Sequence, residues 1–214
     1  RYTEGALPGF LDTPHLWWHQ VFVGAAQIVQ RLHPGTSDAA VGWPTLLEET
    51  AAHLEGQTDV WLRADNAYYN GKLVSFCRAQ GWDYSISVTS MTYKRPVLES
   101  LEGLPADAWE PINDHEEATL TYHRPGRWDH QAAYVVVRTW WDGDQKLTRP
   151  RHVVILCSRD DLPLGEIVAR HRGKQGQETA QKGPLIDLDL HHPPCRRFQA
   201  NRAYYTLGQL AQLL

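Results

Sequence analysis

The chain has 214 residues, of which 42% are hydrophobic and 21% charged, a composition typical of a globular domain with a sizeable core. No apolar run approaches the ~18 residues that a membrane-spanning helix needs, and no secretory signal is visible, so we expect a cytoplasmic protein without a membrane partner. Three widely spaced cysteines, Cys77, Cys157 and Cys195, predict no disulfide framework. The net charge of −4 argues against a nucleic-acid partner when it is taken over the whole chain.

The first 89 residues predict alternating strands and helices after an irregular start over residues 1–18. Apolar spacing and Gly or Pro breakers give strands at 19–24 and 27–32, a helix at 44–53, a strand at 59–64, a helix at 70–80 and a strand at 82–89. The strand at 59–64 leads directly into Asp65. A carboxylate is therefore expected at the carboxyl end of a buried strand.

The character of the sequence changes after residue 89. Strand signals follow at 118–122 and 131–141 with a turn at 142–144, then a buried strand at 151–158 and helices at 163–182 and 201–214. This order predicts an α/β fold, in which a mixed sheet flanked by helices is interrupted by a β-rich insertion. Residues 1–89 and 151–214 would form the two parts of the core, and residues 90–150 the insertion.

Two distant carboxylates, Asp65 and Glu178, are the candidate catalytic and metal-binding residues. Phosphodiester cleavage needs an activated nucleophile and a neutralised anionic transition state, and two divalent ions bridged by carboxylates supply both. Mg²⁺ prefers oxygen ligands and keeps several waters, so two or three carboxylates suffice. A strand-end or helix-capping role for Asp65 is the alternative.

Cations surround Glu178 in the sequence. Residues 166–202 contain seven Lys or Arg against four Asp or Glu, a net charge of +3, so the remainder carries −7. Arg170, Lys174, Glu178 and Lys182 recur at four-residue intervals and would share one helix face. Such a face could hold DNA phosphates beside the metal. Ordinary salt bridges on a solvated helix are the alternative.

Three segments resemble bacterial insertion-sequence DDE transposases. Leu62-Arg-Ala-Asp-Asn-Ala-Tyr-Tyr69 is similar to their second-aspartate motif, and His171-Arg-Gly-Lys-Gln-Gly-Gln-Glu178 to their glutamate motif, Tyr-x2-Arg-x3-Glu-x6-Lys. Residues 201–211 resemble the helix that closes their catalytic domain. The order and separation of these segments match the family layout, which places a β-rich insertion between the second Asp and the Glu.

The resemblance implies a ribonuclease H-like core and two bound Mg²⁺ or Mn²⁺ ions. Asp65 and Glu178 would hold metal, while Arg170, Lys174 and Lys182 would hold donor or target DNA. The reaction would be 3′ nicking of DNA, followed by attack of the freed hydroxyl on another strand. The implied partners are transposon ends and target DNA, with a homodimer in a synaptic complex and a nucleoid-associated location.

The sequence departs from the family pattern at several positions. The motif Tyr is His171, its Arg is Lys174, and its final Lys falls on Leu185, so Lys182 would have to act from the preceding turn. The first catalytic Asp should lie on a strand before residue 19. Asp12 stands there in a Pro-flanked loop setting, so we expect the first Asp upstream of Arg1 and treat the chain as an N-terminally truncated fragment.

Aromatic residues of the insertion are further candidates. Related transposases use aromatics there to stack on a flipped base, which makes Trp128, on an expected loop, a candidate DNA contact. Trp140 and Trp141 would more simply pack the insertion's own sheet. The segment 191–195, His-His-Pro-Pro-Cys, matches no common zinc signature and is read as a rigid loop, with Asp187 and Asp189 as solvated acids or extra carboxylates.

Three functions follow from these observations. The first is a DDE transposase catalytic domain that nicks and transfers DNA with Mg²⁺. The second is a catalytically inert transposase remnant that acts only as a DNA-binding module. The third is a Trp-rich carbohydrate-processing protein, which predicts exposed coplanar tryptophans in a groove.

Overall fold

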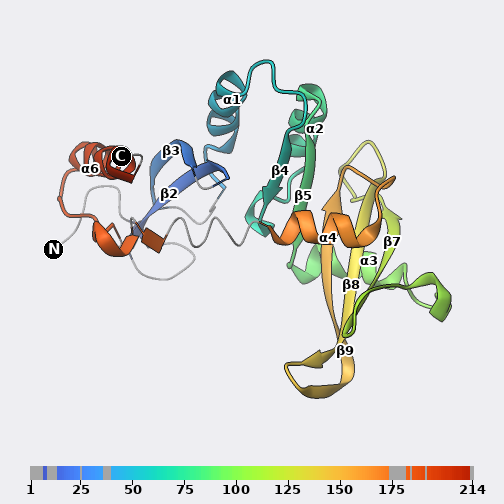
Figure 1. The fold of residues 1–214 in the computed structure, drawn as a ribbon. Coiled ribbons are helices and arrows are strands. Elements are labelled where there is room, and N and C mark those ends of the chain that lie inside the picture. Colours follow the sequence, from blue (N-terminus) through green and yellow to red (C-terminus); the bar gives the residue numbers. More distant parts are fainter. Residues whose placement is uncertain are drawn as a thin grey trace. The chain divides into compact units, whose positions relative to one another are not determined.

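The computed structural model describes residues 7–8, 14–24, 26–35, 40–173, 182–183, 185–190 and 192–212. The chain divides into two compact units, one of residues 1–56 with 175–214 and the other of residues 57–174 (Figure 1). No helix among the described residues is both long and apolar enough to cross a membrane.

The first unit contains a three-stranded antiparallel sheet in the order β1-β2-β3. Its elements are β1 (Leu7–Pro8), β2 (Pro14–Val23), β3 (Ala26–Pro34), α1 (Trp43–His53) and α6 (Phe198–Gln212). The hairpin turns at Gly24, whose φ of 60° suits a residue without a Cβ. A core cluster of Leu32, Leu190 and Tyr205 joins β3 to α6.

The second unit is built on a six-stranded mixed sheet in the order β4-β5-β9-β8-β7-β6. The strands are β4 (Trp61–Ala64), β5 (Asp83–Val88), β6 (Glu110–Asn113), β7 (Glu116–His123), β8 (Ala132–Asp142) and β9 (Gln145–Cys157). Strand β4 is parallel to β5, and the remaining neighbours are antiparallel. The expected α/β class with a mixed sheet and flanking helices is confirmed.

Helices cover both faces of this sheet. They are α2 (Gly71–Gln80), α3 (Met91–Glu99) and α4 (Leu164–Arg172), with short 3₁₀ turns η1 (Asn66–Tyr68) and η2 (Ala106–Ala108). Ala133 and Val135 of β8 join the α4 core cluster, whereas Tyr134 between them reaches the other face and hydrogen-bonds Tyr69 at 2.7 Å between hydroxyls. Since both faces are covered, β8 is apolar at consecutive positions rather than alternating ones.

Most predicted elements are present, but β9 begins six residues before the expected start at residue 151, and β1 and β6 were not expected. Strand β2 begins at Pro14, five residues before the expected start, and helix α3, which contains Pro96, lies in the segment that was expected to be β-rich. The strands of residues 90–150 continue the sheet that contains β4 and β5, and β9 runs without a break across residue 150. The division into two core parts and an insertion stays a prediction. The second half of the helix expected at 163–182 lies largely outside the described residues.

Candidate functional site

Asp65 lies at the carboxyl end of β4, as the sequence predicts. Its side chain caps η1, with Oδ1 accepting a hydrogen bond from the Ala67 N–H at 2.9 Å. The residue is exposed to solvent. The capping role and a metal-binding role are compatible, because the cap uses one carboxylate oxygen and leaves Oδ2 available as a hard donor.

The neighbouring Asn66 fixes this strand end against β5. Its Oδ1 accepts hydrogen bonds from the backbone N–H groups of Thr89 at 2.9 Å and Ser90 at 3.2 Å. These two residues directly follow β5, so one amide side chain joins the ends of both parallel strands. Asp65 is thereby held next to a residue that is hydrogen-bonded to the segment following β5.

Helix α4 is attached to the strand that delivers Asp65. Arg63 Nη1 donates to the Arg170 carbonyl oxygen at 3.2 Å, near the end of the helix. A Cβ built on Gly173 would approach Arg63 Nη1 to 2.5 Å, so a side chain there would displace the guanidinium. The end of α4 is therefore held by a residue two positions before Asp65.

His171 makes a second attachment of α4 to the sheet. The ring is 5% exposed, and its two nitrogens lie 3.0 Å from the hydroxyls of Ser85 and Ser87 on β5. Trp61 Nε1 also donates to the Ser85 hydroxyl at 3.1 Å. The residue that replaces the motif Tyr is thus a buried link between α4 and β5.

The cations of α4 are engaged in ion pairs. Arg170 lies 2.9 Å from Glu166, and its guanidinium carbon is 4.9 Å from the centre of the Trp61 ring. Arg172 donates two hydrogen bonds to Glu116 of β7, at 2.6 and 2.7 Å. These bonds lower the pKa of the Glu116 carboxyl.

The other predicted residues of the cationic face are placed only in part. Glu178 and Lys174 lie outside the residues that the structure describes. Lys182 is described and exposed, in the first unit. The joint face of Arg170, Lys174, Glu178 and Lys182 therefore stays a prediction.

Trp128 lies on the loop between β7 and β8 and is half-buried. Its ring stacks on that of Tyr69, with ring centres 5.6 Å apart and an angle of 27° between the ring planes. The centre of the His130 ring lies 5.5 Å from that of Trp128. The indole covers Gly71 at the start of α2, where an added Cβ would lie 2.8 Å from Nε1. Trp128 thus anchors its loop beside the segment that carries Asp65.

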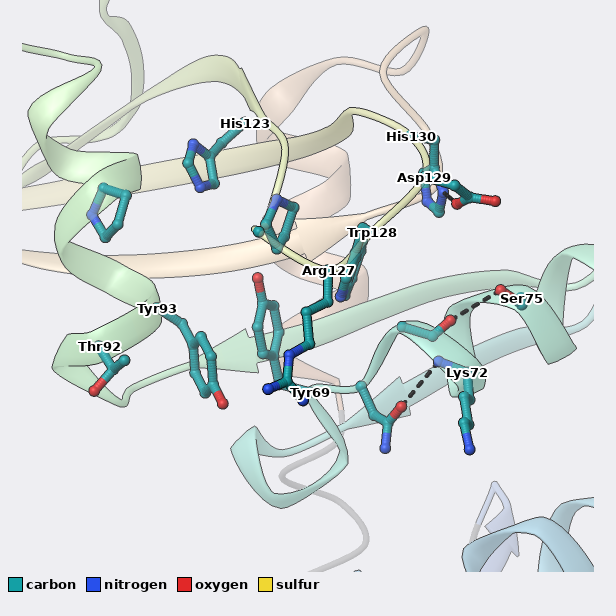
Figure 2. Close-up of a pocket in the computed structure, with 15 residues that line it drawn as sticks. Tyr69, Lys72, Ser75, Thr92, Tyr93, His123, Arg127, Trp128, Asp129 and His130 are labelled. Atoms are coloured by element: carbon teal, nitrogen blue, oxygen red, sulfur yellow. Dashed lines mark hydrogen bonds and ion pairs between the residues drawn. The ribbon is translucent and has the colours of Figure 1, made fainter.

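A groove of about 1140 Å³ opens at this contact, and we call it the Tyr69 groove. Figure 2 shows Tyr93 of α3 on one side, Lys72 of α2 on the other, and the loop bearing Arg127 and Trp128 across them. Sequence reasoning missed Tyr69, Lys72, Tyr93 and Arg127 as groove residues. Tyr69 belongs to the aspartate motif and Arg127 adjoins Trp128, but their convergence depends on tertiary structure.

The described residues near the C-terminus support the rigid-loop interpretation of segment 191–195. The Asn201 side chain, which is 0% exposed, hydrogen-bonds both the N–H and the carbonyl of Cys195 at 2.9 Å. His192 and Asp189 form an exposed contact of 3.7 Å. No group of three or more potential metal-ligating side chains occurs within the described ranges.

Comparison with known proteins adds one finding. The family model described as "Transposase DDE domain" matches residues 25–213. A search of curated proteins finds no match. The mixed sheet flanked by helices is compatible with the ribonuclease H-like fold of that family.

Proposed function

The chain belongs to the transposase DDE domain family, and we propose that it cuts and joins DNA with the help of divalent metal ions. Asp65 is the observation that carries the proposal. It is an exposed carboxylate at the end of a strand whose turn is held by Asn66, in the motif that resembles the family's second aspartate. A rigid turn keeps such a ligand in one geometry, which metal-assisted catalysis requires.

The donor chemistry of Asp65 fits a hard cation. The family generally uses divalent metals, and we infer Mg²⁺ or Mn²⁺ for this chain. A bound pair of such ions supplies an activated nucleophile and neutralises charge on the phosphate. Asp65 would contribute the oxygen that its hydrogen bond to the Ala67 N–H leaves available, with the cap fixing the orientation of the carboxylate.

Glu178 is the proposed second ligand. Support comes from the end of α4, because Arg63 holds the Arg170 carbonyl and closely approaches Gly173. Five residues lead from Gly173 to Glu178. A metal site shared by Glu178 and Asp65 is the proposal that follows from the two motifs.

The DNA contacts are proposed on charge and stacking. Lys174, Lys182 and Arg170 would hold phosphates, with Arg170 exchanging Glu166 for DNA, and Trp128 would offer an aromatic contact. A homodimer would align two transposon ends. The position of the first catalytic Asp stays a prediction.

The carbohydrate-processing alternative loses its support. It predicts several exposed coplanar tryptophans in a groove. Among its described lining residues, the Tyr69 groove contains one tryptophan, Trp128, and this ring is stacked on Tyr69.

Nicking of a supercoiled plasmid in the presence of Mg²⁺ or Mn²⁺ tests the proposal. We expect metal-dependent nicking by the chain and a loss of about 100-fold or more in Asp65→Asn, because a metal ligand is removed. Asp107→Asn is the matched control, since Asp107 is an exposed acid on η2. If the chain binds plasmid but never nicks it with either metal, the inert DNA-binding remnant is the correct function.

A further inference from the structure

The Tyr69 groove contains a row of aromatic rings that continues beyond Trp128. The ring centre of Tyr69 lies 5.6 Å from that of Trp128 and 4.9 Å from that of Tyr93. Trp128 is half-buried, whereas Tyr93 is 47% exposed. Tyr93 is therefore the ring most open to a ligand, and Tyr69 lies between it and Trp128 in the row.

Two cations flank this row of rings. Lys72 lies on α2 and Arg127 on the loop, both are exposed, and neither has an acidic partner among the described residues. Figure 2 shows Arg127 pointing from the loop into the space between α3 and α2. The acid that lines the groove, Asp129, is already bound to His130, with Oδ1 and Nδ1 2.6 Å apart. The net character of the groove is thus cationic.

We propose that the Tyr69 groove binds an unpaired single strand of DNA. Exposed aromatic rings bind the faces of unstacked bases, which a duplex keeps covered, and cations beside them bind the phosphates that link those bases. The volume of about 1140 Å³ exceeds the ~300–1,000 Å³ of small-molecule pockets and suits a segment of polymer.

In this arrangement Tyr93 stacks on a base, while Lys72 and Arg127 hold the adjoining phosphates. The inference rests on the proposed function, because a domain that cuts DNA releases strand ends near Asp65. Tyr69 is four residues from Asp65 in the chain, so the groove starts beside the turn that carries the carboxylate.

Fluorescence anisotropy with a labelled strand of about 12 thymidines, against a duplex of the same length, tests the proposal. We expect the single strand to bind more tightly than the duplex. Tyr93→Ala should weaken single-strand binding about 5- to 100-fold, whereas Tyr93→Phe, which keeps the ring, should bind like the wild type. The double variant Lys72→Ala/Arg127→Ala should reduce the slope of log K against log salt by about 1.4.

Arg149→Ala is the matched control for lost charge, because Arg149 is an exposed cation on β9 and does not line the groove. Equal binding of duplex and single strand, or wild-type binding by the double variant, overturns the proposal. Tighter binding of a uridine strand shows that the ligand is RNA and also overturns it.

Asp65→Asn separates this proposal from the catalytic one. It should lose nicking and keep single-strand binding. Wild-type nicking without single-strand binding removes the groove proposal alone, and single-strand binding without nicking removes the catalytic proposal alone.

Discussion

Arg63 Nη1 donates a hydrogen bond to the Arg170 carbonyl oxygen at 3.2 Å, and this bond joins the strand that ends in Asp65 to the helix that leads towards Glu178. Carbonyl groups in the last turn of a helix lack a partner within the helix, and a cation there also interacts favourably with the helix dipole. The bond therefore gives the end of α4 a fixed position on β4. In the sequence, Asp65 follows Arg63 by two residues and Glu178 follows Arg170 by eight.

Removing the Arg63 guanidinium should release the end of α4. We expect Arg63→Ala to lower the free energy of unfolding by about 1 kcal/mol, because one exposed hydrogen bond is lost. Nicking should fall about 10- to 100-fold, since a small misplacement of a catalytic group costs that much. Urea denaturation and the plasmid assay measure the two effects. Arg95→Ala, at an exposed position on α3, should change neither, and an equal loss in this control would refute a specific role for Arg63.

Gly71 should tolerate no side chain, because the Trp128 indole lies over it. We expect Gly71→Ala to displace Trp128 and to destabilise the unit by about 1–3 kcal/mol, although alanine normally favours a helix. Because Trp128 lines the Tyr69 groove, the same substitution should weaken binding of the thymidine strand. Gly126→Ala is the control, because Gly126 lies in the loop that bears Trp128 and its Cβ would meet nothing within 4 Å. Urea denaturation should separate the two variants, and similar stabilities would contradict the packing of Trp128 described here.

The pair of Glu116 and Arg172 should make stability depend on acid pH. Hydrogen bonds from Arg172 are the largest cause of the lowered pKa of Glu116, whose ordinary value is 4.5. A lowered pKa in the folded state stabilises the protein above pH 4.5, and this stabilisation is lost as the pH falls through the folded value.

Arg172→Ala should therefore cost about 1 kcal/mol at pH 7 and less at pH 3, below the ordinary pKa of the Glu116 carboxyl. Urea denaturation at both pH values measures the difference. Arg151→Ala removes a more exposed pair with Asp142, whose side chains are 61% and 51% exposed, and should have little effect at either pH. A cost for Arg172→Ala that is the same at both pH values would show that the pair is not its source.

Local signals in the sequence predict the strand before Asp65 and the capped helix after it. Asp65 follows a short apolar strand, and Asn70 and Gly81 bound α2 as N-cap and C-cap. The early start of β2 is harder to predict, because Pro14 reads as a breaker although proline is accepted as the first residue of a strand. Helix α3 is also hard to predict from the sequence, because it contains Pro96, and proline usually breaks a helix.

The contacts around Asp65 could not be predicted, because they join residues far apart in the chain. Asn66 bonds residues that follow β5, and Arg63 reaches α4 across 107 positions. The Tyr69 groove likewise combines three separate segments, 69–75, 92–96 and 123–130. Residue spacing predicts which side chains share a helix face. The contacts between distant segments depend instead on the order of the strands in the sheet.

Strand β9 connects the two halves of the sheet in the unit of residues 57–174. It pairs with β8 along much of its length and with β5 through its last four residues, Val154 to Cys157. Since β5 is the parallel neighbour of β4, separation of β9 from β5 would expose the strand that lies beside the one ending in Asp65. A substitution that unfolds β9 would therefore remove hydrogen bonds from both β5 and β8, and we expect the unit to unfold cooperatively.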